Sequence, residues 1–229
     1  MTLRIVIPTW SRCNDLLPEC LESINDNFDQ LVIIKNPHPD RDEKIAIPEK
    51  LQVNTCVIYP KKNLGCAGSW NVGLSMANWG TRIDRVVGRG MFVRKSWQNA
   101  VLINDDIVLV PGAIKCLVSH LVNNSCSGIA FSEEKFSFWA LSYEIWSQVG
   151  LFDESFWPAY YEDLDWLHRF RLLGFHEPGI FGIPGLRHAR SSSIPAGDRD
   201  VIREKNERLY NKKWGGGWTS EKFSNPYGI

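Results

Sequence analysis

The stretch NAVLINDDIVLVPGAIKCLVSHLV, residues 99–122, places an apolar strand, an acidic turn and a helix in direct succession. Its first residues, NAVLIN (99–104), are typical of a strand buried on both faces, as in a parallel sheet. Asp105 and Asp106 follow at the end of this strand, and a Pro-Gly pair then opens a segment with the apolar spacing of a helix. A buried strand that ends in carboxylates and leads into a helix predicts an α/β fold with a ligand site at that end.

The same alternation of strand and helix extends over the first half of the chain. Other short β-branched runs predict buried strands at 3–7, 30–35 and 54–59. Helical spacing of apolar residues recurs at 15–26, 66–78 and 111–122. We therefore expect a mostly parallel, Rossmann-like sheet with helices on both faces, and a ligand site in the loops that follow its strands.

Length and charge limit the classes of function. The 229 residues, 44% of them hydrophobic, suffice for a single domain with a full core. Lys plus Arg and Asp plus Glu balance at 26 each, so the chain lacks the broad positive charge that nonspecific nucleic-acid binding needs. No apolar run reaches the roughly 20 residues that span a bilayer. The N-terminus does not resemble a secretion signal either, so we expect a cytoplasmic protein whose only membrane contact would be peripheral.

The chain also has a compositional boundary near its end. Residues 1–190 carry the strand and helix patterns, whereas 191–229 are polar, Gly-rich and aromatic. We expect the second segment to be an ordered C-terminal extension or lid packed on the first. The six cysteines show no zinc-like spacing, which indicates free thiols.

The acidic turn after residue 103 is a candidate metal site. Mg²⁺ and Mn²⁺ prefer one or two carboxylates, completed by substrate phosphates. His188, which follows a strand-like run in FGIPGLRHARSSS, is a candidate further ligand. Each feature has a plainer interpretation as well, because Asn and Asp are common turn residues and an isolated histidine is more often simply polar.

A second group of acids lies in FWPAYYEDLDWLHRFRLLGF, residues 156–175. The apolar spacing predicts a short amphipathic helix that begins near Glu162, and acids in the first turn of a helix are stabilised by its dipole. That interpretation does not account for the Pro-broken aromatic loop before the helix, where Trp157, Tyr160 and Tyr161 could stack on a sugar ring. The stretch therefore predicts either a plain helix start or a carboxylate site for carbohydrate, and the helix start should favour the ionised form of Asp163.

Glycines and amides gather around another predicted helix start in KKNLGCAGSWNVGL, residues 61–74. Glycines at such a start allow a ligand to approach the backbone closely. The chain has no GxGxxG, Walker A, GxSxG or HExxH motif, which argues against dinucleotide-binding, P-loop, hydrolase and zincin functions.

Five segments, taken in order, resemble family 2 glycosyltransferases of the GT-A fold: VIPTWSR, NLGCAGSWNVGL, LINDDIVLVPGAI, VGLFDESFWPAYYEDLDWLHRFRLLGF and RHARSSS. The resemblance is to rhamnosyltransferase-like and galactofuranosyltransferase-like members in particular and covers about residues 3–190. A later YNKKWGGGW is similar to a segment near the end of some of these enzymes. The resemblance implies an inverting, metal-dependent transfer of sugar from a UDP-sugar or dTDP-rhamnose to a hydroxyl of a glycan or glycoconjugate acceptor, as in polysaccharide biosynthesis.

The resemblance also implies roles for the acids and aromatics of residues 156–175. Asp163 corresponds to the catalytic base of the family, and Glu162 beside it would orient or bind the acceptor. Trp157 and Tyr161 are the implied acceptor-binding residues.

The remaining implied roles concern the donor. Asp106 and His188 correspond to the ligands of Mn²⁺ or Mg²⁺. The residues implied for the nucleotide-sugar are Pro8, Thr9, Arg12, Asn36, Asn63, Gly65, Gly68, Asn71, Asn104 and Asp105.

The sequence departs from the family pattern in places. Lys35 and Asn36 occupy the position of an acidic residue that usually reads the pyrimidine base, and Asn104 replaces the first Asp of the DXD element. Residues 80–98 are rich in Arg and Lys, have no counterpart in the pattern, and indicate either an inserted basic flap or a solvated hairpin. Two other functions remain open: a catalytically silent glycan-binding module of the same fold, and a sugar-nucleotide pyrophosphorylase, which the first loop PTWSR does not favour.

Overall fold

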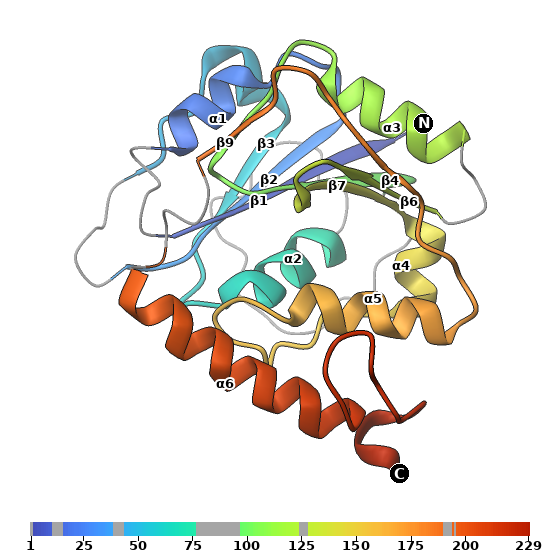
Figure 1. Ribbon diagram of the computed structural model, residues 1–229. Helices are drawn as coiled ribbons and strands as arrows, with labels where there is room; N and C mark the ends of the chain where they lie inside the picture. The colour runs from blue at the N-terminus through green and yellow to red at the C-terminus, as the bar shows by residue number, and fades with distance from the viewer. Residues whose placement is uncertain are drawn as a thin grey trace.

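The computed structural model (Figure 1) describes residues 2–10, 16–38, 44–76, 97–123, 128–189, 194 and 196–229. Its centre is a seven-stranded sheet in the order β3-β2-β1-β4-β7-β6-β8. The four predicted strands form its parallel half, in which β1 (Leu3–Thr9) lies between β2 (Gln30–Lys35) and β4 (Asn99–Ile103), and β3 (Thr55–Ile58) pairs with β2. The central strands β1, β2 and β4 are buried over nearly their whole length, because both faces of the sheet are covered.

The other half of the sheet is antiparallel at its centre, and the sequence patterns do not predict it. β7 (Lys135–Ser142) runs antiparallel to both β4 and β6 (Ile129–Ser132), and β8 (Ile180–Phe181) adds a short parallel edge strand beside β6. A separate two-stranded ribbon pairs β5 (Ile107–Val108) with β9 (Arg187–His188), with His188 opposite Ile107. This ribbon brings the histidine to the acidic turn that precedes β5.

Helices cover both faces of the sheet, as the alternating pattern predicts (Figure 1). α1 (Leu17–Ser23) and α3 (Ala113–Asn123) pack on one face through aliphatic side chains. α2 (Gly65–Ser75), α4 (Tyr143–Val149) and α5 (Glu162–Leu172) pack on the other, where Trp70, Trp139 and Trp166 form the centre of an aromatic core. The predicted α/β class with a mostly parallel sheet is therefore confirmed.

The C-terminal tail forms one long helix, α6 (Ala196–Trp214), which lies outside α5 (Figure 1). Tyr210 and Trp214 of α6 pack with Phe156 in a small apolar cluster that is separate from the two cores on the sheet. The remaining short helices are the 3₁₀ turns η1 (Glu49–Asn54) and η2 (Pro226–Gly228). Within the described ranges, no helix combines the length and the apolar character needed to cross a membrane.

Candidate active site

A pocket at the carboxyl ends of β1, β2 and β4 brings together most of the residues that the sequence indicates. Strands that run parallel end at the same edge of the sheet, so side chains far apart in the sequence meet there. The predicted residues in the lining are Pro8, Thr9, Asn36, Asn63, Gly65, Asn104, Asp105, Asp106, Glu162, Asp163 and His188. Tyr160 of the predicted aromatic loop also lines the pocket. The lining further includes residues that sequence reasoning missed, namely Trp10, Cys66, Trp70, Phe136, Ser137, Pro158, Ala159 and Ile194.

The acidic turn after β4 is held in place by its first two residues. Asn104 donates a side-chain hydrogen bond to Ser137 Oγ at 3.2 Å. Asp105 accepts one from Thr9 Oγ at 2.6 Å, which ties the end of β4 to the end of β1. Asp106 differs from both, because its Oδ1 is buried and has no hydrogen-bond partner in the described part of the chain. A buried carboxylate oxygen without a donor is costly, so this atom calls for a cation or another donor.

His188 supplies the second candidate ligand. Its Nε2 lies 3.3 Å from Asp106 Oδ1, and its Nδ1 lies 2.7 Å from Oε2 of Glu134, in the turn between β6 and β7. A carboxylate on one ring nitrogen fixes the tautomer and leaves the other nitrogen free to bind a metal. Burial opposes the charged form of His188, but the carboxylates of Asp106 and Glu134 beside its two ring nitrogens outweigh burial and raise its pKa above the ordinary value.

These two atoms fit a divalent cation. One carboxylate oxygen and one imidazole nitrogen converge, and the far side of the ring is held by Glu134, which is the usual support of a metal-binding histidine. The described residues contain no group of three or more such ligands, so substrate oxygens and water would complete the coordination of Mn²⁺ or Mg²⁺.

The acids at the start of α5 lie in the same pocket. Tyr160 and Tyr161 before them have φ of 74° and 75°, so the chain enters the helix through two successive left-handed residues. Glu162 is buried, its Oε2 has no hydrogen-bond partner in the described part of the chain, and it accepts a hydrogen bond from the thiol of Cys66. Asp163 accepts a hydrogen bond from the backbone N–H of Leu164 at 2.8 Å.

Burial controls the protonation of this pair. It raises the pKa of Glu162 well above the ordinary value, and the negative charge of Asp163 raises that pKa further. Burial also raises the pKa of Asp163. Backbone N–H groups at the helix start do favour the ionised form of Asp163, as predicted, but desolvation outweighs them.

Gly65 is needed for the packing of two backbone segments. Its φ is +68°, and a Cβ at this position would lie 2.6 Å from the carbonyl oxygen of Pro158. The backbone N–H of Cys66 donates to the same oxygen at 2.7 Å. The absence of a side chain at Gly65 therefore lets the loop before α5 pack closely against the start of α2. Close approach of a ligand is not needed to explain this glycine.

Some of the predicted residues do not line the pocket: Gly68, Asn71, Trp157 and Tyr161. Asn71 bonds to the backbone of Phe152 through both ends of its amide, at 2.8 and 2.9 Å. Trp157 is 46% exposed, and the ring of Tyr161 lies 5.5 Å from that of Tyr210. Arg12 lies outside the described residues, as does the basic segment 80–98 except for its last two positions.

Two supporting residues have no signal in the sequence. Glu134 reaches His188 across 54 positions. Asn206 of α6, fully buried, donates to the carbonyl oxygens of Ala159 and Tyr160 at 2.9 and 3.1 Å. Both contacts depend on tertiary structure, so neither a motif nor a spacing reveals them.

Comparison with known proteins shows the fold, together with a family match over the first part of the chain. Residues 4–79 match the model of glycosyl transferase family 2. Glucosyl-3-phosphoglycerate synthase from Mycobacterium tuberculosis, solved with Mn²⁺, UDP and glucosyl-3-phosphoglycerate, is similar with a TM-score of 0.55 at 12% identity, covering 88% of this chain and 75% of that chain. S. aureus TarS 1-349, solved with UDP-GlcNAc, is similar with a TM-score of 0.51 at 11% identity, covering 92% and 67%. No curated protein sequence matches significantly.

Proposed function

We propose that the chain is a family 2 glycosyltransferase of the GT-A fold, which transfers a sugar, with inversion, from a nucleotide-diphosphate donor to a hydroxyl of a glycan or glycoconjugate. The family match of residues 4–79 and the fold shared with two solved structures support this proposal. The observation that supports this reaction best is the presence in one pocket of two separate side-chain pairs. Asp106 and His188 fit a cation, and Glu162 and Asp163 are acids whose pKa values burial raises. A UDP-sugar is the first choice of donor, because both similar structures hold UDP or a UDP-sugar. The rhamnosyltransferase-like motifs make dTDP-rhamnose the second.

The donor diphosphate is proposed to lie at the Asp106 end of the pocket. Mn²⁺ or Mg²⁺ held by Asp106 and His188 would neutralise the charge that grows on the diphosphate as the glycosyl bond breaks. Glu134 keeps the imidazole in one orientation, and the bond from Thr9 to Asp105 fixes the turn that carries Asp106. Both constraints reduce the rearrangement needed when donor binds.

Asp163 is the proposed general base. It takes the proton of the acceptor hydroxyl while the hydroxyl oxygen bonds to the anomeric carbon from the face opposite the leaving diphosphate, so the configuration inverts. The raised pKa of Asp163 makes it a stronger base than an exposed aspartate. Burial and the negative charge of Asp163 raise the pKa of Glu162 well above its ordinary value, so ionisation of Asp163 opposes that of Glu162.

Asn36 is proposed to shape the nucleotide pocket instead of reading the base. Its Nδ2 donates to Ser69 Oγ at 2.9 Å and its Oδ1 accepts from the backbone N–H of Leu64 at 2.8 Å. These bonds fix the loop after β2 against α2 and use the amide groups that would otherwise face a base.

The test is release of nucleoside diphosphate from UDP-, dTDP- and GDP-sugars, with Mn²⁺ or with chelator. We expect metal-dependent release from one donor, lost in Asp106→Ala and kept in Asp200→Ala, which removes an exposed acid of α6 outside the pocket. No release from any donor, together with no thermal shift on addition of donor, would overturn the proposal in favour of a silent glycan-binding module.

A further inference from the structure

A second pocket opens beside the proposed donor site. The two pockets share Phe136, Ser137, Tyr160 and Asp163 in their linings. A hydroxyl held in the second pocket therefore has access to the proposed base. Its other walls come from α5, from α6 and from the segments around β6 and β8.

Aromatic rings form much of this second pocket, and an arginine guanidinium group lies over each of two of these rings. The aromatic lining residues are Phe131, Phe136, Tyr160, Tyr161 and Trp218. Arg203 lies 5.2 Å from the centre of the Tyr160 ring, and Arg171 lies 4.1 Å from that of Trp218. A guanidinium group stacked on an aromatic ring keeps its N–H edge available for a carboxylate or a phosphate.

The carboxylates of the lining are already engaged. Glu134 holds the imidazole of His188, and Glu177 forms an ion pair with Arg171. The third carboxylate is that of Asp163, the proposed base. None of these acids neutralises the remaining cations of the pocket.

Two cations remain without a carboxylate partner in the described part of the chain, Arg203 on α6 and Lys135 at the start of β7. Glu207 lies one helical turn after Arg203 but hydrogen-bonds to the hydroxyl of Tyr161. Both unpaired cations are exposed side chains that line the pocket. Within the described ranges no carboxylate forms an ion pair with either of them, so both charges are available to a ligand.

We propose that the second pocket binds an acceptor that carries an acidic group, a carboxylate or a phosphate, close to the hydroxyl that receives the sugar. Arg203 is its main partner and Lys135 a second one, while the aromatic walls pack on the apolar faces of the acceptor. The assignment of this pocket to the acceptor rests on the proposed transferase function. The preference for an acidic ligand rests only on the cations and rings of the pocket.

The experiment measures binding, so it does not depend on turnover. Saturation-transfer NMR with Mg²⁺ and UDP present compares matched pairs: methyl β-glucuronide with methyl β-glucoside, methyl β-galacturonide with methyl β-galactoside, and glycerol 3-phosphate with glycerol. A charge-assisted hydrogen bond to Arg203 predicts that at least one acidic member binds about tenfold more tightly than its neutral partner. The uronic acids and the phosphate then distinguish the two acidic groups.

Two variants test the role of Arg203. Arg203→Gln keeps a long polar side chain and should abolish the acidic preference. Arg208→Gln, on the same helix, removes an exposed arginine that pairs with Glu204 and does not line the pocket, so the preference should persist.

Equal binding of acidic and neutral members, binding of none of the acidic members, or an unchanged preference in Arg203→Gln would each overturn the proposal. Donor release, measured in parallel, separates this failure from that of the transferase function. Metal-dependent release without an acidic preference removes only the acidic acceptor. An acidic preference without release leaves an acidic-ligand site on a protein that is not a transferase.

Discussion

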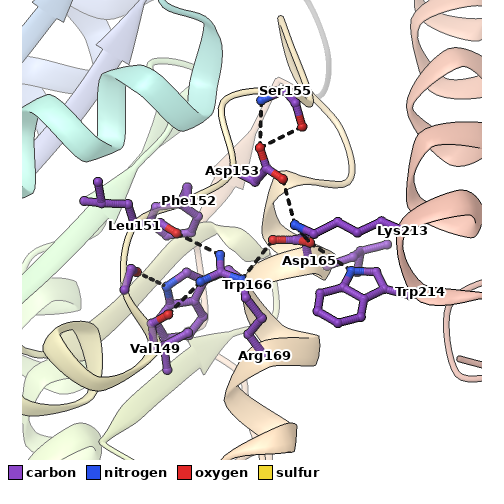
Figure 2. Close-up of polar contacts among 12 residues, drawn as sticks. Val149, Leu151, Phe152, Asp153, Ser155, Asp165, Trp166, Arg169, Lys213 and Trp214 are labelled. Atoms are coloured by element: carbon purple, nitrogen blue, oxygen red, sulfur yellow. Dashed lines mark hydrogen bonds and ion pairs between the residues drawn. The ribbon is translucent and has the colours of Figure 1, made fainter. Parts of the chain in front are cut away.

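Replacing Lys213 by Met should destabilise the protein, because this side chain neutralises two acids at the junction of α5, α6 and the loop after α4 (Figure 2). Its Nζ lies 2.6 Å from Asp165 Oδ1 and 2.7 Å from Asp153 Oδ2. The side chains of Lys213 and Asp165 are 7% and 0% exposed, so water cannot replace the lost charge. Methionine keeps a flexible stem against the rings of Phe156 and Trp214, so packing changes little.

The magnitude follows from what remains around Asp165. Removing one partner of a buried ion pair costs about 3–5 kcal/mol. Arg169 still donates to Asp165 Oδ2 at 3.0 Å and the Trp214 indole to Oδ1 at 2.9 Å, so the aspartate retains one positive neighbour. We therefore expect a loss at the lower end of that range, about 3 kcal/mol.

Urea unfolding followed by circular dichroism measures this loss. Lys212→Met, at the exposed neighbouring position, is the matched control and should stay within about 0.5 kcal/mol of the parent. Adding Asp165→Asn to Lys213→Met should restore part of the stability, since the uncompensated charge is then gone. A loss below about 1 kcal/mol in Lys213→Met would refute the reasoning, because the pair would then behave as a solvated surface contact.

The pH dependence gives an independent check. Burial raises the pKa of Asp153, but hydrogen bonds from Lys213 and Ser155 outweigh burial and lower it overall. A lowered folded-state pKa contributes stability that is present above the ordinary pKa of aspartate and is lost as pH falls through the folded value. That acid-side loss should be smaller in Lys213→Met.

The other predictions concern the site. Asp163→Asn should lower transfer by about 10²–10⁴-fold with donor binding retained; in the parent, kcat/KM should rise with pH through a value above the ordinary aspartate pKa, because burial raises the pKa of this base. Glu134→Gln should weaken Mn²⁺ binding about 10–100-fold by loosening His188, as measured by Mn²⁺ titration of donor release. Glu133→Gln is the control, and an equal affinity in the two variants would show that Glu134 has no such role. Asn206→Ala should lower kcat more than it raises KM by freeing the loop before α5, and Asn206→Asp should not restore kcat, because a carboxylate cannot donate to the loop carbonyls.

Local periodicity was sufficient for half of the sheet. The strands β1, β2 and β4 are buried on both faces, so each contains a short run of consecutive apolar residues in the sequence. β7 is different, because its pairing with β4 sets Trp139 opposite Leu102, and no local pattern contains that register. The sequence patterns did not predict α6, because the buried face of this helix includes Asn206 and Lys213. Both are polar, so they obscure the apolar periodicity of an amphipathic helix.

The residues of the candidate site also fall into those that the local sequence predicts and those that depend on tertiary structure. Residues that follow strands, such as Thr9 and Asp106, could be placed together because parallel strands end at one edge. The residues that orient them come from elsewhere in the fold, as Glu134 does for His188. Protonation was also beyond the sequence, because the raised pKa values of Glu162 and Asp163 depend on burial, whereas a sequence shows only their place at a helix start.

The tail is best understood as part of the proposed catalytic machinery. Tyr160 and Tyr161, just before the acids, both have positive φ, and such residues cost about 1–3 kcal/mol each unless their surroundings hold them. α6 provides that support from one face, since Asn206 bonds the carbonyl groups of Ala159 and Tyr160, and Lys205 bonds that of Trp157 at 3.2 Å. Intramolecular hydrogen bonds are worth about 1 kcal/mol each, so the sum of these three is comparable to the lower end of the strain. By offsetting this strain, α6 helps to hold Asp163 in the position from which it lines both pockets.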